Sequence, residues 1–279
     1  MTTFARPAVM GVLNVTPDSF SDGGDFLAPG AALAHARTMA ADGADLIDVG
    51  GESTRPGAGP VSTDEELRRV LPVLEALAEG GVAVSIDTSK APVARAAAAA
   101  GVTFVNDVTA LRGDPGMAAV VAESGADLCL MHMLGEPRTM QDDPRYEDVV
   151  GEVVSFLEQR LAFAVGEGIA EDRIWLDPGI GFGKTLAHNL ELLRRLDEIV
   201  AIGRPVVVGA SRKRFLGALT GQAERDRIAG TVAANVLAYE RGAHMFRVHD
   251  VRATRDALSV VSATVDETRP EASDSPRLG

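Results

Sequence analysis

The sequence predicts a single α/β domain with the (β/α)8 (TIM) barrel fold. Short apolar runs rich in β-branched residues alternate along the chain with longer stretches of helical periodicity. About eight such units fit into roughly 250 residues, which matches a closed barrel better than an open doubly wound sheet. We assign residues 1–265 to this domain. Residues 266–279, rich in proline, serine and charge, form a flexible tail in this interpretation.

Each predicted strand ends on small or polar residues. In chain order the runs 10–13, 46–49, 82–86, 104–105, 128–131, 174–176, 205–208 and 245–246 lead into Asn14, Gly50, Asp87, Asn106, His132, Asp177, 209–213 and 247–250. Strands that alternate with helices pair in parallel, so these ends meet at one rim. Active sites of such barrels lie at that rim, and we expect the chemistry there.

The predicted helices follow from apolar spacing and from end signals. An alanine-rich helix spans 31–42 and stops at Gly43. A capping box that begins at Ser62 or Thr63 opens a helix running to about Glu79. Pro92 lies in the first turn of a third helix, which ends at Gly101. Further helices are expected at about 115–124, 146–167, 187–199, 225–241 and 252–263.

The composition restricts the partners. The net charge of −13 and the pI near 4.8 argue against nucleic acid or anionic membrane, because both attract basic surfaces. An anionic substrate would need locally concentrated cations. Cys129 is the only cysteine and lies in an apolar run, which predicts a buried core residue. Without a secretory signal or an apolar run of membrane-spanning length, we expect a soluble cytoplasmic protein.

Acidic and amide side chains form one candidate group at the rim. Asp87 and Asp177, together with Asn106, suit a neutral heterocycle with an adjacent ring N–H and an exocyclic amine. They also suit a metal site, and any one acid alone could simply cap the next helix.

Cationic side chains form the second group. Lys213 and Arg247 follow the last two strands, a frequent phosphate site of such barrels, and His249 lies two residues further on. The alternative for the run 212–214 is a solvated helix start. His132 is better explained as a structural histidine. The segment 179–185 is not a P-loop, because Pro178 stands where the first glycine should be.

Seven segments, in order between residues 8 and 262, resemble the dihydropteroate synthase family. These segments are 14–24, 50–57, 85–88, 106–108, 177–182, 211–213 and 247–250. The resemblance implies condensation of 6-hydroxymethyl-7,8-dihydropterin diphosphate with 4-aminobenzoate, with Mg²⁺, to give 7,8-dihydropteroate and pyrophosphate for folate synthesis. It also implies a homodimer that forms through barrel helices.

The resemblance assigns the matching residues to three groups. The group that binds the pterin is Asp87, Asn106, Asp177 and Lys213. The group at the diphosphate and Mg²⁺ is Arg247, His249 and Asn14, with Asn14 as metal ligand and with Thr54 and Arg55 on the second loop. The walls around aminobenzoate are Phe20, Ser53, Pro56, Phe182 and Lys213. Arg214 departs from members that carry a small hydroxyl residue there, so the group that binds the aminobenzoate carboxylate stays open.

The expected mechanism is substitution with dissociative character. Arg247, His249 and Mg²⁺ would stabilise the departing pyrophosphate, while Asp87, Asp177 and Lys213 act on the pterin. Two long loops, 14–29 and 50–60, would close and exclude water. The alternatives are a methyltetrahydrofolate–corrinoid methyltransferase, a non-catalytic pterin-binding paralogue and a sugar-phosphate barrel enzyme.

Overall fold

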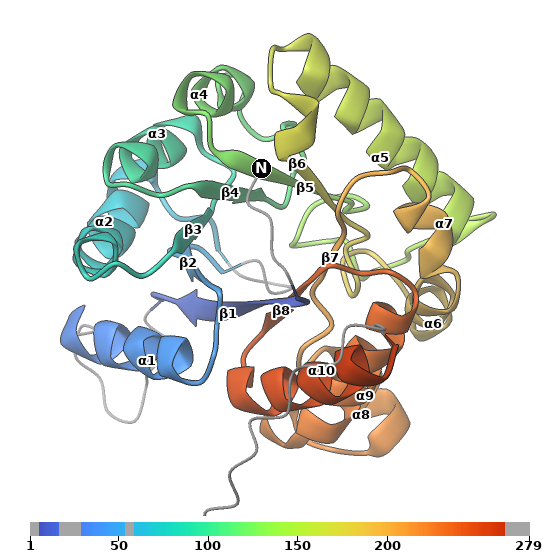
Figure 1. The fold of residues 1–279 in the computed structure, drawn as a ribbon. Helices are drawn as coiled ribbons and strands as arrows, with labels where there is room; N and C mark the ends of the chain where they lie inside the picture. The colour runs from blue at the N-terminus through green and yellow to red at the C-terminus, as the bar shows by residue number, and fades with distance from the viewer. Residues whose placement is uncertain (1–5, 17–28, 54–58, 266–279) are drawn as a thin grey trace, which may run out of the picture.

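Eight parallel strands form the centre of the molecule (Figure 1). The computed structural model describes residues 6–16, 29–53 and 59–265. The strands are β1 (Ala8–Asn14), β2 (Leu46–Gly50), β3 (Val84–Asp87), β4 (Phe104–Asp107), β5 (Asp127–Met131), β6 (Ile174–Asp177), β7 (Val207–Val208) and β8 (Met245–Val248). Their order is β6-β5-β4-β3-β2-β1-β8-β7, and a bridge between Leu176 and Val206 joins the two ends. The predicted (β/α)8 barrel is confirmed.

Helices surround the strands on the outside of the barrel (Figure 1). They are α1 (Pro29–Ala41), α2 (Thr63–Glu79), α3 (Ala91–Ala99), α4 (Met117–Ser124), α5 (Val149–Gly166), α6 (Leu186–Arg194), α7 (Leu196–Val200), α8 (Arg214–Thr220), α9 (Ile228–Glu240) and α10 (Val251–Val265). The start of α2 agrees with the prediction, because the Ser62 hydroxyl accepts a hydrogen bond from the Glu65 amide. The second half of the predicted capping box is replaced, because the Glu65 carboxylate accepts from Arg68 and Arg69 instead. Asp148 caps α5 in the same way through the Val150 amide.

Two helical segments differ from the prediction. The helix expected at 187–199 is divided into α6 and α7, because Arg195 leaves the helical conformation (φ −109°, ψ 30°). The Arg195 guanidinium bonds Asp148 and Glu198, which fixes this break by contacts that apolar spacing does not reveal. The separate helix α8 follows directly after Lys213, where the sequence indicated only that a helix could start.

The barrel interior contains an apolar floor below a polar layer. The floor is a cluster of buried side chains: Ala8, Met10, Leu46, Phe104, Cys129, Trp175, Val207 and Met245. Side chains of a strand alternate between its two faces, so residues two positions further along share the interior face. Those residues are Asp48 after Leu46, Asn106 after Phe104, Asp177 after Trp175 and Arg247 after Met245. The polar layer therefore lies inside the barrel at the carboxyl ends of the strands.

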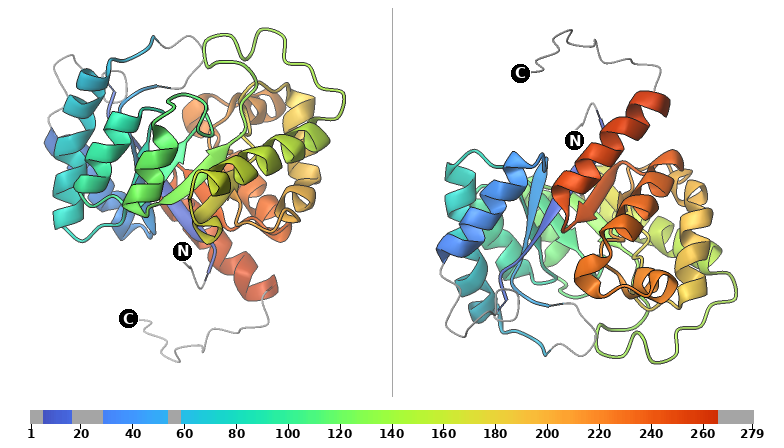
Figure 2. Two further views of the ribbon diagram at one scale, coloured as in Figure 1. Left: turned by 90° about the horizontal axis from the view of Figure 1, so that it is seen from above. Right: turned by 90° about the horizontal axis from the view of Figure 1, so that it is seen from below.

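The two ends of the barrel differ. Figure 2 shows the long connection from β5 to α5 on one side of the molecule and the last turns of α10 on the opposite side. In the described part of the chain, no helix combines the length and apolar character needed to span a membrane. The tail predicted at 266–279 lies outside the described residues.

Candidate active site

Arg247 connects two carboxylates inside the barrel mouth. Its Nε lies 2.6 Å from Asp48 Oδ2, and its Nη2 lies 2.8 Å from Asp87 Oδ2. Burial opposes the charge of Arg247, but Asp48 and Asp87 raise its pKa above the usual value, so the side chain is protonated. Burial also raises the pKa of Asp87, to about 7, although Arg247 opposes this shift. The site therefore contains a carboxyl group whose ionised form is disfavoured by burial and favoured by Arg247.

Asp48 is a site residue that the sequence did not reveal. It has no exposed surface, and its Oδ2 also accepts a hydrogen bond of 3.1 Å from Asn106 Nδ2. Its Oδ1 is buried and has no hydrogen-bond partner among the residues that the structure describes. The sequence pattern that could have indicated Asp48 is an acidic residue inside the apolar run 46–49, two residues after a leucine that faces the barrel interior. Asp48 orients both Arg247 and Asn106 from below.

Asp177 lies at the end of β6, across the mouth from Asp87. Its Oδ1 accepts a hydrogen bond of 2.6 Å from the Gly179 amide. Burial raises the pKa of Asp177, while this amide and the charges of Lys213 and Arg247 oppose the shift. An ideal Cβ on Gly209 would lie 3.9 Å from both Asp177 Oδ2 and Arg247 Cβ. Gly209, directly after β7, thus lies beside both of these predicted site residues.

The three cationic residues after β7, Arg212, Lys213 and Arg214, have different surroundings. Lys213 Nζ lies 4.0 Å from the centroid of the Phe182 ring, which brings two predicted aminobenzoate-wall residues together. Arg212 forms an ion pair with Asp250, and Arg214 is exposed. The predicted solvated helix start therefore applies to Arg214.

His249 is oriented by a serine from the neighbouring strand end. Ser211 Oγ lies 3.0 Å from His249 Nδ1 and accepts a hydrogen bond of 3.1 Å from the His249 amide. Arg247, two residues earlier, extends instead toward β2 and β3. That Arg247 and His249 reach one anion stays a prediction.

The sequence matches the pterin-binding enzyme family over residues 10–249. It is 48% identical to the dihydropteroate synthase of Escherichia coli K12 over 262 residues, covering 94% of this chain and 93% of that protein. The chain belongs to the dihydropteroate synthase family. This confirms the predicted family and the class of enzyme, a transferase of folate biosynthesis.

Solved structures of dihydropteroate synthases have the same fold. A Xanthomonas albilineans dihydropteroate synthase with 4-aminobenzoic acid is 52% identical, with a TM-score of 0.88 and 93% of each chain covered. The enzyme from the same organism in complex with 7,8-dihydropteroate is 47% identical, with a TM-score of 0.85, covering 94% of this chain and 95% of that one. The fold of this chain therefore agrees with the family that its sequence indicates.

The other site residues predicted for this dihydropteroate synthase fold lie at the end of β1 and on the two long loops, and the structure describes some of them. Asn14 is the last residue of β1, and an ideal Cβ on Gly50 would lie 3.7 Å from its Oδ1 and 3.6 Å from Asp87 Cβ. Asn14 and Asp87 thus flank Gly50 on the two neighbouring strands. Ser53 is described and half-buried. Phe20, Thr54, Arg55 and Pro56, and with them the closure predicted for the two loops, lie outside the described residues.

The start of the second predicted loop is held by buried charge. Glu52 and Glu66 both accept hydrogen bonds from Lys90 Nζ, and Glu66 has no exposed surface. Glu52 also accepts a hydrogen bond from the Val61 amide, 3.0 Å away. These contacts fix the two described ends of the segment 50–60.

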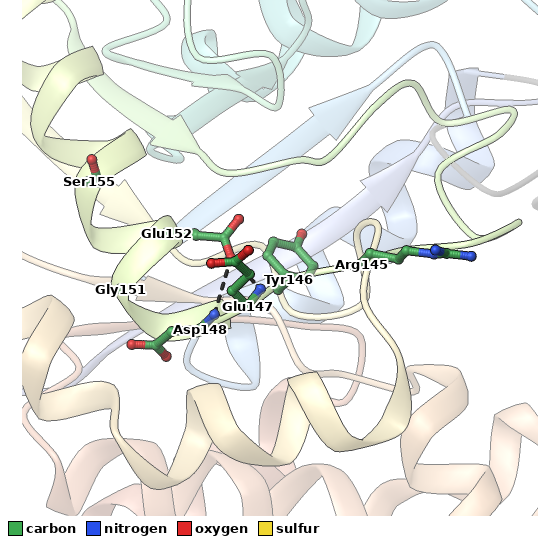
Figure 3. A pocket seen from close by; sticks show the side chains of 7 residues that line it. All are labelled: Arg145, Tyr146, Glu147, Asp148, Gly151, Glu152 and Ser155. Atoms are coloured by element: carbon green, nitrogen blue, oxygen red, sulfur yellow. Dashed lines mark hydrogen bonds between the residues drawn. The ribbon is translucent and has the colours of Figure 1, made fainter.

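A hollow of about 790 Å³ lies elsewhere, at the start of α5 (Figure 3). Its lining comes from one stretch of chain: Arg145, Tyr146, Glu147, Asp148, Gly151, Glu152 and Ser155. Glu152 already accepts hydrogen bonds from the amides of Glu147 and Asp148 (Figure 3). Because no strand-end residue lines this hollow, we place the site at the polar layer of the barrel mouth.

Proposed function

We propose that this protein condenses 6-hydroxymethyl-7,8-dihydropterin diphosphate with 4-aminobenzoate, giving 7,8-dihydropteroate and pyrophosphate. One observation carries the proposal: the polar layer brings Asp87, Asn106 and Arg247 into one hydrogen-bonded group at the barrel mouth, in a dihydropteroate synthase fold. This group combines carboxylate acceptors for a heterocycle with a cation for the leaving anion.

The pterin would lie against the carboxylates. Its ring N–H groups and exocyclic amine are donors, which ionised Asp87 and Asp177 can accept. Lys213 would donate to the pterin carbonyl oxygen, and Asn106, oriented by Asp48, offers an amide oxygen and an amide nitrogen. When Asp87 accepts from the substrate, the bond to Asp48 keeps Arg247 in place.

The leaving pyrophosphate would be stabilised by Arg247 and His249. Cleavage of the carbon–oxygen bond leaves negative charge on the pyrophosphate and positive charge on the methylene carbon, which the aryl amine then attacks. The guanidinium carries more N–H donors than its two carboxylate contacts use. Substitution with dissociative character is the mechanism that this charge distribution favours, and it needs no covalent enzyme intermediate.

Mg²⁺ fits the donor chemistry at Asn14. Among the described residues, no three His, Cys, Asp or Glu side chains are grouped as metal ligands, so a site made only of protein ligands is not supported. Mg²⁺ commonly keeps water molecules and takes substrate phosphate oxygens with one or two protein oxygens. The Asn14 amide would supply such an oxygen. When bound, the cation would neutralise charge on the diphosphate.

The aminobenzoate ring would lie against Phe182 and the aliphatic part of Lys213. Its carboxylate needs a donor at the start of α8. Arg212 is engaged by Asp250, and the Arg214 side chain is exposed at this helix start. Ser211, which bonds His249, supplies a hydroxyl in the same segment. Substitution of each of these groups in turn would show which one donates to the aminobenzoate carboxylate.

Pyrophosphate release by the purified protein tests the function. The protein would be incubated with dihydropterin diphosphate and Mg²⁺, with and without 4-aminobenzoate, while dihydropteroate is measured separately. Release that requires aminobenzoate and yields dihydropteroate supports the synthase. Pterin binding without release would identify the non-catalytic paralogue. Methyl transfer from methyltetrahydrofolate to a corrinoid would identify the methyltransferase.

We also propose a homodimer and a cytoplasmic location. The packed helices α9 and α10 leave apolar side chains exposed, among them Ile228 at 39% and Val260 at 68%. A second copy of the chain is the partner that the family resemblance implies for this face. Sedimentation of wild type against Val260→Glu would test it. Buried Cys129, the only cysteine, is compatible with a reducing compartment.

A further inference from the structure

Lys184 is a buried lysine that the proposed reaction does not use. Its side chain is enclosed by the loop 178–183, which follows β6, and only 3% of the residue surface is exposed. Nζ lies 2.8 Å from His132 Nδ1, 2.9 Å from the Phe182 carbonyl oxygen and 3.0 Å from the Gly179 carbonyl oxygen. The His132 carbonyl oxygen, 3.4 Å away, is a fourth acceptor, so each of the three N–H donors of an ammonium group has a partner.

The environment of the pair determines which group donates. Burial, with the nearby charge of Lys184, lowers the pKa of His132 to about 2, so the imidazole is neutral. Its Nδ1 can then accept from Lys184. Burial also lowers the pKa of Lys184, to about 7, while Asp177 opposes this shift. The lysine is thus directed at internal acceptors and away from solvent.

The loop fits closely against the segment that follows β5. Gly179 has φ +66°, and an ideal Cβ there would lie 1.9 Å from the His132 carbonyl oxygen. At Gly183 (φ +61°) an ideal Cβ would lie 2.7 Å from the Leu134 carbonyl oxygen. The Tyr146 hydroxyl donates to the Gly183 carbonyl oxygen at 2.9 Å. Lys184 therefore lies between two segments that are already in close contact.

Two candidate site residues depend on this loop. The Gly179 amide donates to Asp177 Oδ1 at 2.6 Å, and the Phe182 ring lies 4.0 Å from Lys213 Nζ. Lys184 binds the carbonyl oxygens of these same two loop residues, Gly179 and Phe182. If the Lys184 amine shifted, the Gly179 amide that donates to Asp177 would move, and the Phe182 ring would move with it.

We propose that Lys184 is a positioning residue: with His132 as acceptor it fixes the loop 178–183, and through it Asp177 and Phe182. The proposal rests on the proposed function, which gives Asp177 a pterin and Phe182 an aminobenzoate to contact. In this proposal Lys184 does not contact either substrate, but the pterin site and the aminobenzoate site both depend on its buried amine.

The first test compares Lys184→Met with wild type. Methionine fills similar space without N–H donors, and we expect kcat/KM to fall about 10- to 100-fold, with a raised KM for aminobenzoate, because loop displacements near 1 Å have costs of that size. Arg95→Met, at an exposed position on α3 away from the proposed dimer face, is the matched control and should keep wild-type kinetics. A purely stabilising role would lower Tm but leave both KM values unchanged well below Tm, and that result overturns the proposal.

A second readout does not depend on activity. The chain contains three lysines, Lys90, Lys184 and Lys213, so lysine labelled with ¹³C at Cε gives three resonances. The ring current of Phe182 should displace the Lys213 resonance, and in Lys184→Met this resonance should move toward that of a free lysine. An unmoved resonance together with unchanged KM overturns the positioning role. A wild-type protein that forms no dihydropteroate overturns only the proposed function.

A pair of His132 variants keeps the proposal testable if Lys184→Met does not fold. His132→Asn places an amide oxygen near the position of Nδ1, whereas His132→Leu removes the acceptor. We expect His132→Asn to keep the Lys213 resonance and the KM for aminobenzoate near their wild-type values, and His132→Leu to change both. Equal values for the two variants would show that the acceptor has no role in positioning the loop.

Discussion

Arg247 Nε donates to Asp48 Oδ2 across 2.6 Å, although the two residues are 199 positions apart in the chain. The carboxylate of Asp48 has no exposed surface, and it also accepts from Asn106. The guanidinium of Arg247 is therefore held between two carboxylates, with Asp48 at Nε and Asp87 at Nη2.

Asp48→Asn should reduce both stability and activity. It removes one of the two carboxylates paired with Arg247, which is itself partly exposed, so the loss in free energy of unfolding should lie at or below the about 3–5 kcal/mol of a broken buried ion pair. Urea unfolding followed by the fluorescence of Trp175, which is buried in the barrel floor, measures this cost. Asp256→Asn, which breaks an exposed pair with Arg252, should change little. Equal stability of the two variants would contradict a contribution from the buried pair.

The pH dependence of stability should contain a contribution from Asp87. Burial raises its folded-state pKa to about 7 from an ordinary value of 3.8, so the fold favours the protonated carboxyl. This contribution is complete below the unfolded pKa and is lost as pH rises through about 7. The free energy of unfolding of wild type, relative to Asp87→Asn, should therefore decrease from about pH 4 to about pH 8. A constant difference across this range would show that Asp87 is ionised throughout.

The ionisation of Asp87 should also affect catalysis, where activity should rise with pH while stability falls. Ionised Asp87 is the form that accepts the pterin N–H groups, so kcat/KM for the pterin diphosphate should rise with pH through about 7. The rise should disappear in Asp87→Asn and persist in Asp256→Asn. If Asp87→Asn kept the wild-type pH profile, another group would have to account for it.

Gly179→Ala should be costly for a steric reason that can be separated from backbone strain. Gly203 also has a positive φ (+87°), but an ideal Cβ there meets no atom within 4 Å. Gly203→Ala should therefore cost only the strain of a left-handed residue, about 1–2 kcal/mol. Gly179→Ala should cost more, because its Cβ would lie 1.9 Å from the His132 carbonyl oxygen. Chemical unfolding of both variants measures the difference, and equal costs would refute the close contact.

Substitution of Asn14 should change the Mg²⁺ requirement of the reaction. Asn14→Ala removes the oxygen ligand and should raise the Mg²⁺ concentration for half-maximal rate about tenfold or more. Asn14→Asp supplies a carboxylate, which a hard cation prefers, and should lower that concentration. Rates measured over a Mg²⁺ titration after chelator treatment give both values. Identical titrations for the two variants would exclude Asn14 as a metal ligand.

Much of the fold was predictable because strand and helix patterns are local. Short apolar runs alternate with helical spacing, and Ser62 marks the start of α2 in the sequence itself. The division of the 187–199 helix was not predictable, because Arg195 bonds Asp148 from a different helix start. The site was predictable where polar residues lie at or just beyond the carboxyl end of a strand, as Asp87, Asp177 and Lys213 do.

By itself, the sequence determined the barrel, the rim where the polar strand ends meet, and the family, because each follows from residue order along the chain. Only the tertiary structure decided which partners these side chains take. Asp48 joins Arg247, and Lys184 joins His132, through contacts between segments 199 and 52 residues apart. Such contacts depend on the closure of the barrel and on burial, which decide the orientation and protonation of each group. The chemistry of this site therefore depends on long-range packing that no single stretch of the sequence contains.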